Sequence, residues 1–436
     1  MKNDIGVGIL GLGVVAGQVA RVLHEKAGEL SEKAGSDIVL RKIKVLPQDL
    51  ERPLVAELGR DLFTTDDDEF FNTPGIDIIV EAIGGEHPAL EYHQRALSGG
   101  KHVVTSNKEL IAKHGGELLE LAREHNVGLQ YEASVVGGIP LIAPFKHDLV
   151  ANTITGIFGI INGTTNYILT RMAREGVDFA TVLKQAQELG YAEANPENDV
   201  EGYDSRYKIA ILASLAFQTS VHPEDISCEG ITRLDSRDFR YADELGFVIK
   251  LLAIAKLSDG AIEARVHPVF IPRESMLAKV EGVYNAVQVD GDLVGKVTFI
   301  GEGAGAGATS SAVVADVVST AKKVRQDIAS VSPWKPSRGL KLKPMEDIVT
   351  QYYVRLNASD QAGVLASIAT VFGEKNISIA SAIQPESDDV THSAEIVIMT
   401  HPAREAAMQE ALARLKQLDV VREISNFIRV EEIEGG

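Results

Sequence analysis

The sequence predicts an α/β protein with three successive parts: an open parallel sheet of Rossmann type, an α+β region, and a small ferredoxin-like βαββαβ module. Strands alternate with helices over residues 1–134, a pattern typical of a parallel sheet with right-handed crossovers. Long helices and a separate strand-rich segment follow over residues 135–308. Residues 346–436 then give the order βαββαβ. A chain of 436 residues is long enough for three such domains.

The first part begins with a short apolar strand at residues 5–10, IGVGIL, and a glycine turn that opens an amphipathic helix. The alternation of strands and helices continues to about Glu132, so we place the first domain at residues 1–134. The other elements expected here are strands at 38–46 and 76–85, a helix at 88–100, and a strand–helix–strand run over 101–135.

The second part changes character, because residues 135–172 combine β-rich segments with many turn residues. We place an α+β domain at residues 135–308. A helix at about 309–325, after the glycine cluster GEGAGAGA, is expected to return to the first domain. A Pro- and Lys-rich linker, SVSPWKPSRGLKLKP, precedes the third domain. The elements expected within the second domain are helices at 179–190 and 205–217 and strands over 262–300.

Composition excludes several classes of protein. The formal net charge of −19 argues against a nucleic acid or an anionic membrane as partner, because both select for clustered Lys and Arg. No apolar run approaches the roughly 18 to 20 residues that a membrane-spanning helix needs. The N-terminal segment enters a strand almost at once, so we expect no signal peptide. Cys228 is the single cysteine, which excludes an internal disulfide and a Cys-rich metal site. We expect a soluble, cytoplasmic protein.

The segment from Gly11 to Ala16, GLGVVA, fits the pattern G-x-G-x-x-G/A directly after a strand and before a helix. The first glycine permits a tight turn. The second lets the backbone approach a pyrophosphate, which N–H groups at the helix N-terminus can bind. Glycine turns are common, but here the position and the following βαβ units agree with the pattern. The sequence therefore predicts a dinucleotide cofactor.

The choice between NAD and NADP depends on the end of the second strand. An NAD site usually has an acidic residue there, which binds the ribose 2′-hydroxyl. This segment has no carboxylate until Asp49. Arg41, Lys42 and Lys44 favour the 2′-phosphate of NADP, although they are equally explained as solvated charges at the strand edge. We expect NADP, with NAD as the alternative.

Five acidic residues precede a lysine, Lys208, on the first turn of an apolar helix. One interpretation is that Asp204 caps the helix and forms a surface ion pair with Lys208, which contributes only about 0.3–0.5 kcal/mol. The other is that the acidic loop binds an ammonium group, while Lys208 donates a proton to a carbonyl oxygen that is being reduced. The five acidic residues are Glu193, Glu197, Asp199, Glu201 and Asp204.

The run LGYAEANPENDVEGYDSRYKIAILA resembles the signature of homoserine dehydrogenases, which interconvert aspartate 4-semialdehyde and homoserine with NAD(P). The resemblance covers the whole chain and implies a role in threonine, methionine and isoleucine biosynthesis. It also implies that the second domain binds substrate and mediates dimerisation. The other motifs, in order, are GILGLGVVAGQV, VVTSNKELIA, YEASVVGGIP, GIINGTTNYIL and GEGAGAGATSSAVVAD.

The resemblance implies a role for each site residue. Lys208 would exchange the proton at the substrate oxygen, and Glu193 would bind the substrate amino group. Asp204 would orient the substrate and the lysine. Lys108 matches a second lysine near nicotinamide and substrate, although its local sequence also fits a charge at a helix start. The residues implied to bind the cofactor are Gly11, Leu12, Gly13, Val14, Val15, Ser106, Lys108, Gly190 and Gly303.

The segment YEASVVGGIP matches the monovalent cation site of the family, where main-chain carbonyl oxygens bind a sodium ion of structural role. A tight turn between two domains is the alternative. The sequence departs from the family pattern at Ala16, where glycine is frequent, and at Pro47-Gln48, where an Arg-Asp pair is frequent. The second departure leaves the adenosine contacts open. The implied sodium ligands are Glu132, Val135, Gly137 and Ile139.

The third part resembles an ACT domain, a ferredoxin-like module that often binds amino acids at a dimer interface. In this family it implies feedback inhibition by threonine, and a dimerisation module without ligand is a comparable alternative. The chain is expected to form a homodimer or a homotetramer. The candidate effector contacts are Asp360, Gly363, Leu365, Asn376 and Gln384.

Two other functions fit parts of the pattern. A non-catalytic amino-acid sensor would have the nucleotide fold and the C-terminal module, but it would not need the acidic loop and Lys208. An aspartate-semialdehyde dehydrogenase would need a nucleophilic cysteine. Cys228 has neither a glycine-rich nucleophile turn nor an adjacent histidine.

Overall fold

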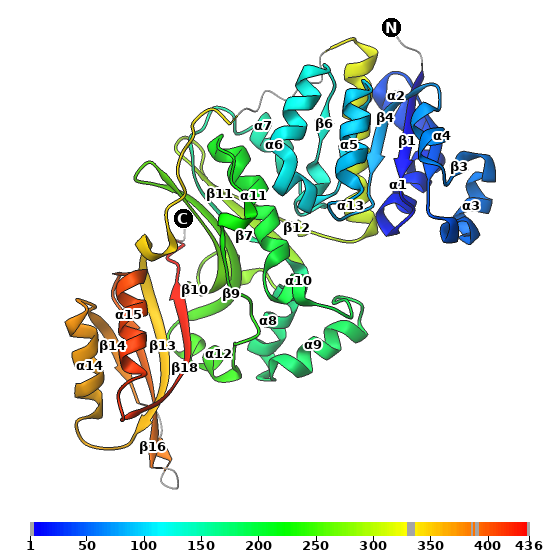
Figure 1. The fold of residues 1–436 in the computed structure, drawn as a ribbon. Coiled ribbons are helices and arrows are strands. Elements are labelled where there is room, and N and C mark those ends of the chain that lie inside the picture. The colour runs from blue at the N-terminus through cyan, green and yellow to red at the C-terminus, as the bar shows by residue number, and fades with distance from the viewer. Residues whose placement is uncertain (1–3, 329–335, 385–386, 389–391, 434–436) are drawn as a thin grey trace. The chain divides into compact units, whose positions relative to one another are not determined.

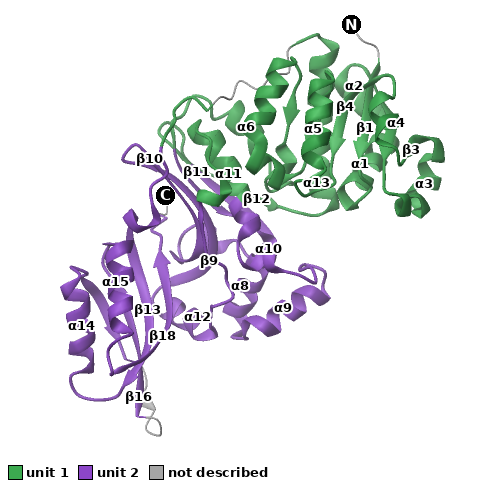
Figure 2. Ribbon diagram, viewed as in Figure 1, with its two compact units in different colours: residues 1–154, 207–225, 290–340 green, residues 155–206, 226–289, 341–436 purple. Residues whose placement is uncertain are grey.

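The computed structural model describes residues 4–328, 336–384, 387–388 and 392–433 (Figure 1). They belong to two compact units (Figure 2). No helix in these ranges is long and apolar enough to cross a membrane. Unit 1 comprises Met1–Ile154, Tyr207–Asp225 and Asp290–Leu340, and unit 2 comprises Thr155–Arg206, Ile226–Val289 and Lys341–Gly436.

Unit 1 contains a parallel sheet with the strand order β3-β2-β1-β4-β5-β6. The strand order reverses between β1 and β4, and open sheets of this kind bind nucleotides at the carboxyl ends of the strands beside such a point. The predicted Rossmann-type domain is therefore confirmed. The strands are β1 (Asp4–Leu10), β2 (Asp37–Lys44), β3 (Phe63–Thr64), β4 (Ile76–Glu81), β5 (His102–Thr105) and β6 (Leu129–Gln130).

Helix α1 (Val14–Glu25) shows why this sequence packs on the sheet. Its buried residues Ala16, Val19, Ala20 and Leu23 recur at helical spacing and form one apolar face.

Unit 1 also contains β12 (Gly295–Glu302) and most of α11 (Tyr203–Phe217). Its other helices are α2 (Ala27–Ala34), α3 (Pro53–Leu58), α4 (Asp67–Asn72), α5 (Ala89–Ser98), α6 (Lys108–Glu124), α7 (Ile142–Lys146) and α13 (Ala306–Arg325).

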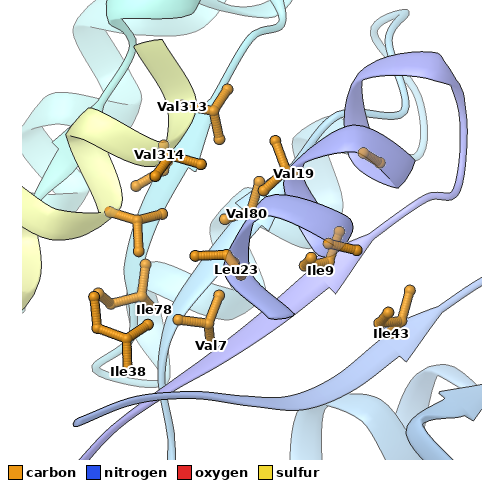
Figure 3. Packing of buried hydrophobic residues seen from close by; sticks show 14 of the residues in the cluster. Val7, Ile9, Val19, Leu23, Ile38, Ile43, Ile78, Val80, Val313 and Val314 are labelled. Atoms are coloured by element: carbon orange, nitrogen blue, oxygen red, sulfur yellow. The ribbon is translucent and has the colours of Figure 1, made fainter. Parts of the chain in front are cut away.

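Helix α13 comes from a distant part of the sequence and packs beside α1. Its residues Val313 and Val314 join Val7, Val19 and Leu23 in a single core between helices and sheet (Figure 3). This packing keeps the first strands and the glycine turn in fixed positions relative to α13.

Unit 2 contains a sheet with the strand order β11-β7-β9-β10-β18-β13-β16-β14. Its first four strands are accompanied by α8 (Gly163–Glu175), α9 (Phe179–Glu188), α10 (Glu197–Val200) and α12 (Ser236–Glu244). Strand β10 continues the sheet into the C-terminal module through parallel pairing with β18. The strands of this first half are β7 (Ile154–Ile160), β8 (Ser227–Cys228), β9 (Phe247–Ser258), β10 (Ala261–Pro272) and β11 (Tyr284–Gly291).

The C-terminal module has the predicted βαββαβ order and its own core. Helices α14 and α15 place Ile368, Phe372 and Met408 against Tyr352 and Val354 of the sheet. Two-residue strands, β15 (Ser387–Asp388) and β17 (Ala403–Arg404), accompany the main elements. The main elements are β13 (Val349–Ser359), α14 (Val364–Glu374), β14 (Ile379–Ile383), β16 (Ser393–Thr400), α15 (Glu405–Leu415) and β18 (Val421–Val430).

Residues 135–172 and strand β9 differ from the sequence-based expectation. Residues 135–172, expected to be rich in strands, contain the helices α7 and α8. Helix α8 begins with Gly and Thr, which favour turns and strands, but the side chain of Asn162 accepts a hydrogen bond from Thr165 N–H and caps the helix. Strand β9 was not expected, because its middle is buried on both faces and shows no alternation of apolar and polar residues.

Candidate active site

The glycine turn after β1 has the geometry of a phosphate-binding loop. Gly11 has φ +100°, which favours glycine, and a Cβ atom there would lie 2.8 Å from the Ile83 side chain. Gly13 precedes α1 without a side-chain cap, and no atom lies within 4 Å of where its Cβ would be. The first N–H groups of α1 therefore have room for an anion. Val14 is 75% exposed beside them, and Leu12 is buried. These residues fit the pyrophosphate of a dinucleotide.

The three cationic side chains of β2 already have acidic partners. Arg41, Lys42 and Lys44 were expected either to bind a 2′-phosphate or to be solvated. Each forms an ion pair with a carboxylate of unit 1, and about a third of the Arg41 side chain remains exposed. The pairs are Arg41–Asp4, Lys42–Glu69 at 2.9 Å and Lys44–Asp67 at 2.9 Å.

Arg52 lies beside the glycine turn and was not identified from the sequence. Its Nη1 donates to the carbonyl oxygen of Leu12 at 2.6 Å, and its Nε pairs with Asp49 at 2.8 Å. Asp49, the first carboxylate after β2, is buried and also accepts from Leu46 N–H. Half of the Arg52 side chain is exposed. Arg52 therefore presents a fixed positive charge next to the loop.

Ser106 and Lys108 follow β5, at the same edge of the sheet as the glycine turn. Asn107, between them, caps α6 by accepting from Leu110 N–H at 3.1 Å. Its amide also donates to the carbonyl oxygen of Gly85, after β4, at 2.7 Å. This places Lys108 as the first residue of α6 and fixes the direction in which the helix starts. Lys108 is half-buried, so it is not a fully solvated charge at a helix start.

The start of α11 carries Asp204 and, one turn later, Lys208, so the two side chains share one face of the helix. Asp204 is 2% exposed and Lys208 is 8% exposed. Asn162, the residue that caps α8, donates from its amide to Asp204 at 2.9 Å and to Asp199 at 2.7 Å. Burial argues against the interpretation of Lys208 and Asp204 as a solvent-exposed pair. Asn162 was not identified from the sequence, because its contact crosses 42 positions.

The remaining predicted site residues lie in turns. The Glu193 side chain is exposed in the loop between α9 and α10, and its carbonyl oxygen accepts from the Gln187 side chain at 3.0 Å. Gly190 follows α9 with φ +77°, and Gly303 is buried between β12 and α13. Gly190, Glu193 and Asp204 belong to unit 2, whereas the glycine turn, Lys108, Lys208 and Gly303 belong to unit 1.

The segment predicted to bind sodium is a compact turn, and the carboxylate of its Glu132 is engaged in hydrogen bonds. Glu132 is buried and accepts three N–H groups at the start of α7, from Leu141 at 2.6 Å, Ile142 at 2.8 Å and Ala143 at 2.7 Å. Within the part of the chain that the structure describes, no cluster of three His, Cys, Asp or Glu side chains could hold a metal. A cation here would therefore bind main-chain carbonyl oxygens, which is the donor type that sodium accepts.

The candidate effector residues divide between the two ends of α14. Gly363, with φ +90°, precedes the helix, and Leu365 is exposed on its first turn. The Gln384 amide approaches the Asp360 carboxylate at 3.4 Å. Asn376, with φ +56°, lies beyond the C-terminus of α14. An α-helix of this length separates its ends by about 16 Å, so Asn376 is remote from Asp360 along the helix.

Cys228 does not have the properties of a nucleophile. Burial raises the pKa of its thiol to about 11. Its Sγ also donates to the carbonyl oxygen of Glu201 at 3.2 Å. Catalytic cysteines need a lowered pKa, because the thiolate is the reactive form. This environment argues against a thioacyl mechanism.

Three family models match successive parts of the chain. The model described as homoserine dehydrogenase, NAD binding domain, matches residues 11–132. The model described as homoserine dehydrogenase matches residues 140–318, and an ACT domain matches residues 352–420. Together these matches extend from the glycine turn to the C-terminal module.

Several full-length proteins are similar to this chain. Homoserine dehydrogenase of Neisseria gonorrhoeae is 42% identical over 99% of both chains, and that of Bacillus subtilis is 38% identical over 98% of both. The crystal structure of a homoserine dehydrogenase from Thiobacillus denitrificans has a TM-score of 0.92 at 40% identity, with 99% of each chain covered. A hyperthermophilic archaeal homoserine dehydrogenase in complex with NADPH has a TM-score of 0.61 at 28% identity, covering 75% of this chain and 99% of its own.

Proposed function

The chain belongs to the homoserine dehydrogenase family of NAD(P)-dependent oxidoreductases, and from this premise we propose that Lys208 carries the proton of the reaction. The observation that supports this role best is the burial of Lys208 one turn after Asp204, whose carboxylate is fixed by Asn162. A buried lysine beside a fixed carboxylate can exchange one proton without competition from bulk water. When bound, the nicotinamide ring supplies or accepts the hydride.

The other proposed roles follow from membership of the family. In the oxidation of homoserine, Lys208 takes the hydroxyl proton as the C–H bond gives up its hydride, and in the reverse direction it returns the proton to the carbonyl oxygen. Glu193, exposed in its loop, binds the substrate ammonium group. Asp204 orients Lys208 and the substrate. Lys108, at the start of α6, would lie near nicotinamide and substrate. These assignments divide binding and proton transfer among four side chains.

Replacement of Lys208 by Ala tests the proposal. We expect kcat for homoserine oxidation to fall by about 10²–10⁴-fold, because a positioned acid–base group contributes that much, while the Kd of NADPH stays within a few-fold. Lys250 is a suitable control, since it is also a buried lysine and its Nζ donates to the carbonyl oxygen of Val280 at 2.5 Å. Lys250→Met should lower stability and leave kcat within a few-fold. Equal kcat in Lys208→Ala and wild type would refute the role.

We propose NADP as the preferred coenzyme, with Arg52 in place of the β2 cations. Its guanidinium is bound to the carbonyl of Leu12 and to Asp49, half of the Arg52 side chain is exposed, and the residue follows β2, the strand whose end selects between a ribose 2′-hydroxyl and a 2′-phosphate. The NADPH complex of the archaeal relative supports this choice. Arg52→Ala should reduce the ratio of kcat/KM for NADP over NAD by about tenfold or more. Lys42→Ala, which removes a cation already paired with Glu69, should leave the ratio unchanged.

A sodium ion of structural role is part of the proposal. The main-chain carbonyl oxygens of Glu132, Val135, Gly137 and Ile139 would hold it, since the Glu132 carboxylate is occupied by α7. Exchange of sodium chloride for tetramethylammonium chloride at equal ionic strength tests the site. The thermal midpoint should fall if the ion is bound, and an unchanged midpoint would exclude it.

We further propose feedback inhibition by threonine through the C-terminal module, in a homodimeric or homotetrameric protein of the cytoplasm. In this proposal, residues 1–134 bind the dinucleotide, residues 135–308 bind substrate and mediate dimerisation, and residues 346–436 bind the effector. Threonine titrations of wild type and Asp360→Ala test the effector, and equal insensitivity would dismiss it. Point variants suit this test better than removal of the module, because truncation would leave the buried Arg265 without Glu431, its partner at 2.7 Å. Light scattering reports the oligomer.

A further inference from the structure

Glu81 is a fully buried carboxylate at the end of β4, where the coenzyme edge of the sheet begins. An ionised carboxylate without donors is costly to bury, so its partners matter. Each of its two oxygens accepts from two donors. Oε1 accepts from Ile83 N–H at 2.8 Å and Gly84 N–H at 3.3 Å, and Oε2 accepts from Thr105 Oγ1 at 2.7 Å and His93 Nε2 at 3.1 Å.

These contacts continue into a closed ring of hydrogen bonds between two loops. Thr105 Oγ1, which donates to Glu81, accepts from Asn107 N–H at 2.9 Å. The Asn107 amide donates to the carbonyl oxygen of Gly85 at 2.7 Å. Gly85 continues the segment whose N–H groups at Ile83 and Gly84 bind Glu81. The ring therefore ties residues 82–85, after β4, to residues 105–107, after β5.

The four donors around Glu81 favour the ionised form of its carboxyl group. Burial alone would raise the pKa of this carboxyl, but His93, Thr105 and the Ile83 N–H hold it below its usual value. A carboxylate can accept from all four donors at once, whereas a neutral amide in the same place has two donors of its own and must leave part of the ring unpaired. The full set of hydrogen bonds in the ring therefore requires the Glu81 carboxylate as the acceptor.

We propose that Glu81 is a positioning residue for coenzyme binding, acting through the loops that carry Ser106 and Lys108. The inference rests on the proposed function only in assigning Ser106 and Lys108 to the coenzyme. Ser106 lies inside the ring, and Lys108 is the next residue after Asn107, which caps α6. A displacement of a reacting group by about 1 Å costs about 10²-fold in rate, so the ring determines how well these residues are placed.

Two variants test the proposal in the full chain, with NADPH fluorescence as the binding measurement. Glu81→Gln replaces one accepting oxygen by a donating amide, and Thr105→Val removes the hydroxyl that links Glu81 to Asn107 while keeping the shape of the side chain. Thr170→Val is a matched control, because the Thr170 hydroxyl also donates to an oxygen, that of Asn166 at 2.7 Å, and accepts from Gly282 N–H at 3.1 Å. Thr170 belongs to unit 2, outside the dinucleotide-binding domain.

We expect the Kd of NADPH to rise about tenfold in Thr105→Val and by at least as much in Glu81→Gln, with a parallel fall in kcat. Thr170→Val should change only the thermal midpoint. If Thr105→Val loses stability like the control but binds NADPH within twofold of wild type, Glu81 is merely structural and the inference is wrong. Should Glu81→Gln fail to fold, Thr105→Val decides. Absence of homoserine oxidation by wild type would instead refute the proposed function, since NADPH binding is measured separately.

Discussion

Two junctions join distant parts of this sequence, and their chemistry differs. In unit 1, α13 joins the first sheet through small aliphatic side chains, with Val313 and Val317 fully buried. In unit 2, the C-terminal module joins the preceding strands through buried arginines. Arg265, Arg355 and Arg429 are each at most 3% exposed, and each pairs with a carboxylate on the other side of the junction: Glu431 at 2.7 Å, Asp238 at 2.7 Å and Glu229 at 2.8 Å, respectively.

The two junctions should lose different amounts of stability when one of their side chains is replaced. Aliphatic packing is non-directional, so a lost methyl group weakens it by a limited amount. A buried ion pair is directional, and removal of one partner leaves the other charge without compensation. Arg355 illustrates this, because it donates to Asp238 of α12 at 2.7 Å and to Glu395 of β16 at 3.0 Å. The charged junction should therefore tolerate substitution less than the aliphatic one.

The largest effect is expected for Arg355→Met. Asp238, which is fully buried, would then keep its charge without this cation, which should lower the free energy of unfolding by about 3–5 kcal/mol, whereas Glu395 would still be paired with Arg237 at 3.1 Å. Denaturant titration followed by circular dichroism measures the change. Adding Asp238→Asn should recover part of the loss, since it removes one uncompensated charge. A loss below about 1 kcal/mol would show that water compensates the pair.

A smaller effect is expected for Val317→Ala in α13. The side chain is fully buried in the core of unit 1, so the substitution leaves a cavity of two methyl groups and should cost about 2–3 kcal/mol. The same titration measures it, and a double variant with Arg355→Met should be additive because the residues lie in different units. A cost equal to that of Arg355→Met would remove the contrast between the junctions.

Acidification should weaken unit 1 through one histidine. Burial lowers the pKa of His102 to about 4, and its Nδ1 accepts from Gly128 N–H at 2.9 Å. The unfolded chain binds a proton at about pH 6.5, so stability is lost as the pH falls from 6.5 to 4, by about 2 kcal/mol at pH 5. His102→Gln should remove that part of the difference in stability between pH 7 and pH 5. An unchanged difference would contradict the assignment.

The smallest effect is expected for Arg21→Ala. Arg21 pairs with Glu57 at 3.3 Å, and both side chains are about two-fifths exposed, at 41% and 42%. Exposed pairs are screened by water and contribute little, so the free energy of unfolding should change less than in any of the other variants. A loss as large as that of Arg355→Met would show that burial does not control the strength of these pairs.

Sequence patterns predicted the parts of the molecule that local rules govern. The spacing of Gly11 and Gly13 predicted a dinucleotide-binding domain, in agreement with the family match over residues 11–132, and alternating strands and helices predicted the parallel sheet. Contacts between distant positions were not predictable. Asn162 meets Asp204 across 42 positions, and Glu81 meets Thr105 across 24. The β2 cations illustrate the same limit, because their partners lie on other elements. A glutamate inside the apolar run IDIIVE was the available signal for Glu81, since unpaired charges are rare in buried strands.

The pairing of β10 with β18 affects the solubility of the chain, because it covers an edge of the sheet. Val269 and Phe270 of β10 form ladder pairs with Arg429 and Val430, and Phe270 O accepts from Glu431 N–H at 2.9 Å. Without the module, this stretch of β10 would become an open apolar edge, and such edges recruit strands from other molecules. Removal of the C-terminal domain would then favour aggregation of the remaining chain. The module therefore protects the sheet of unit 2, whether or not it binds a ligand.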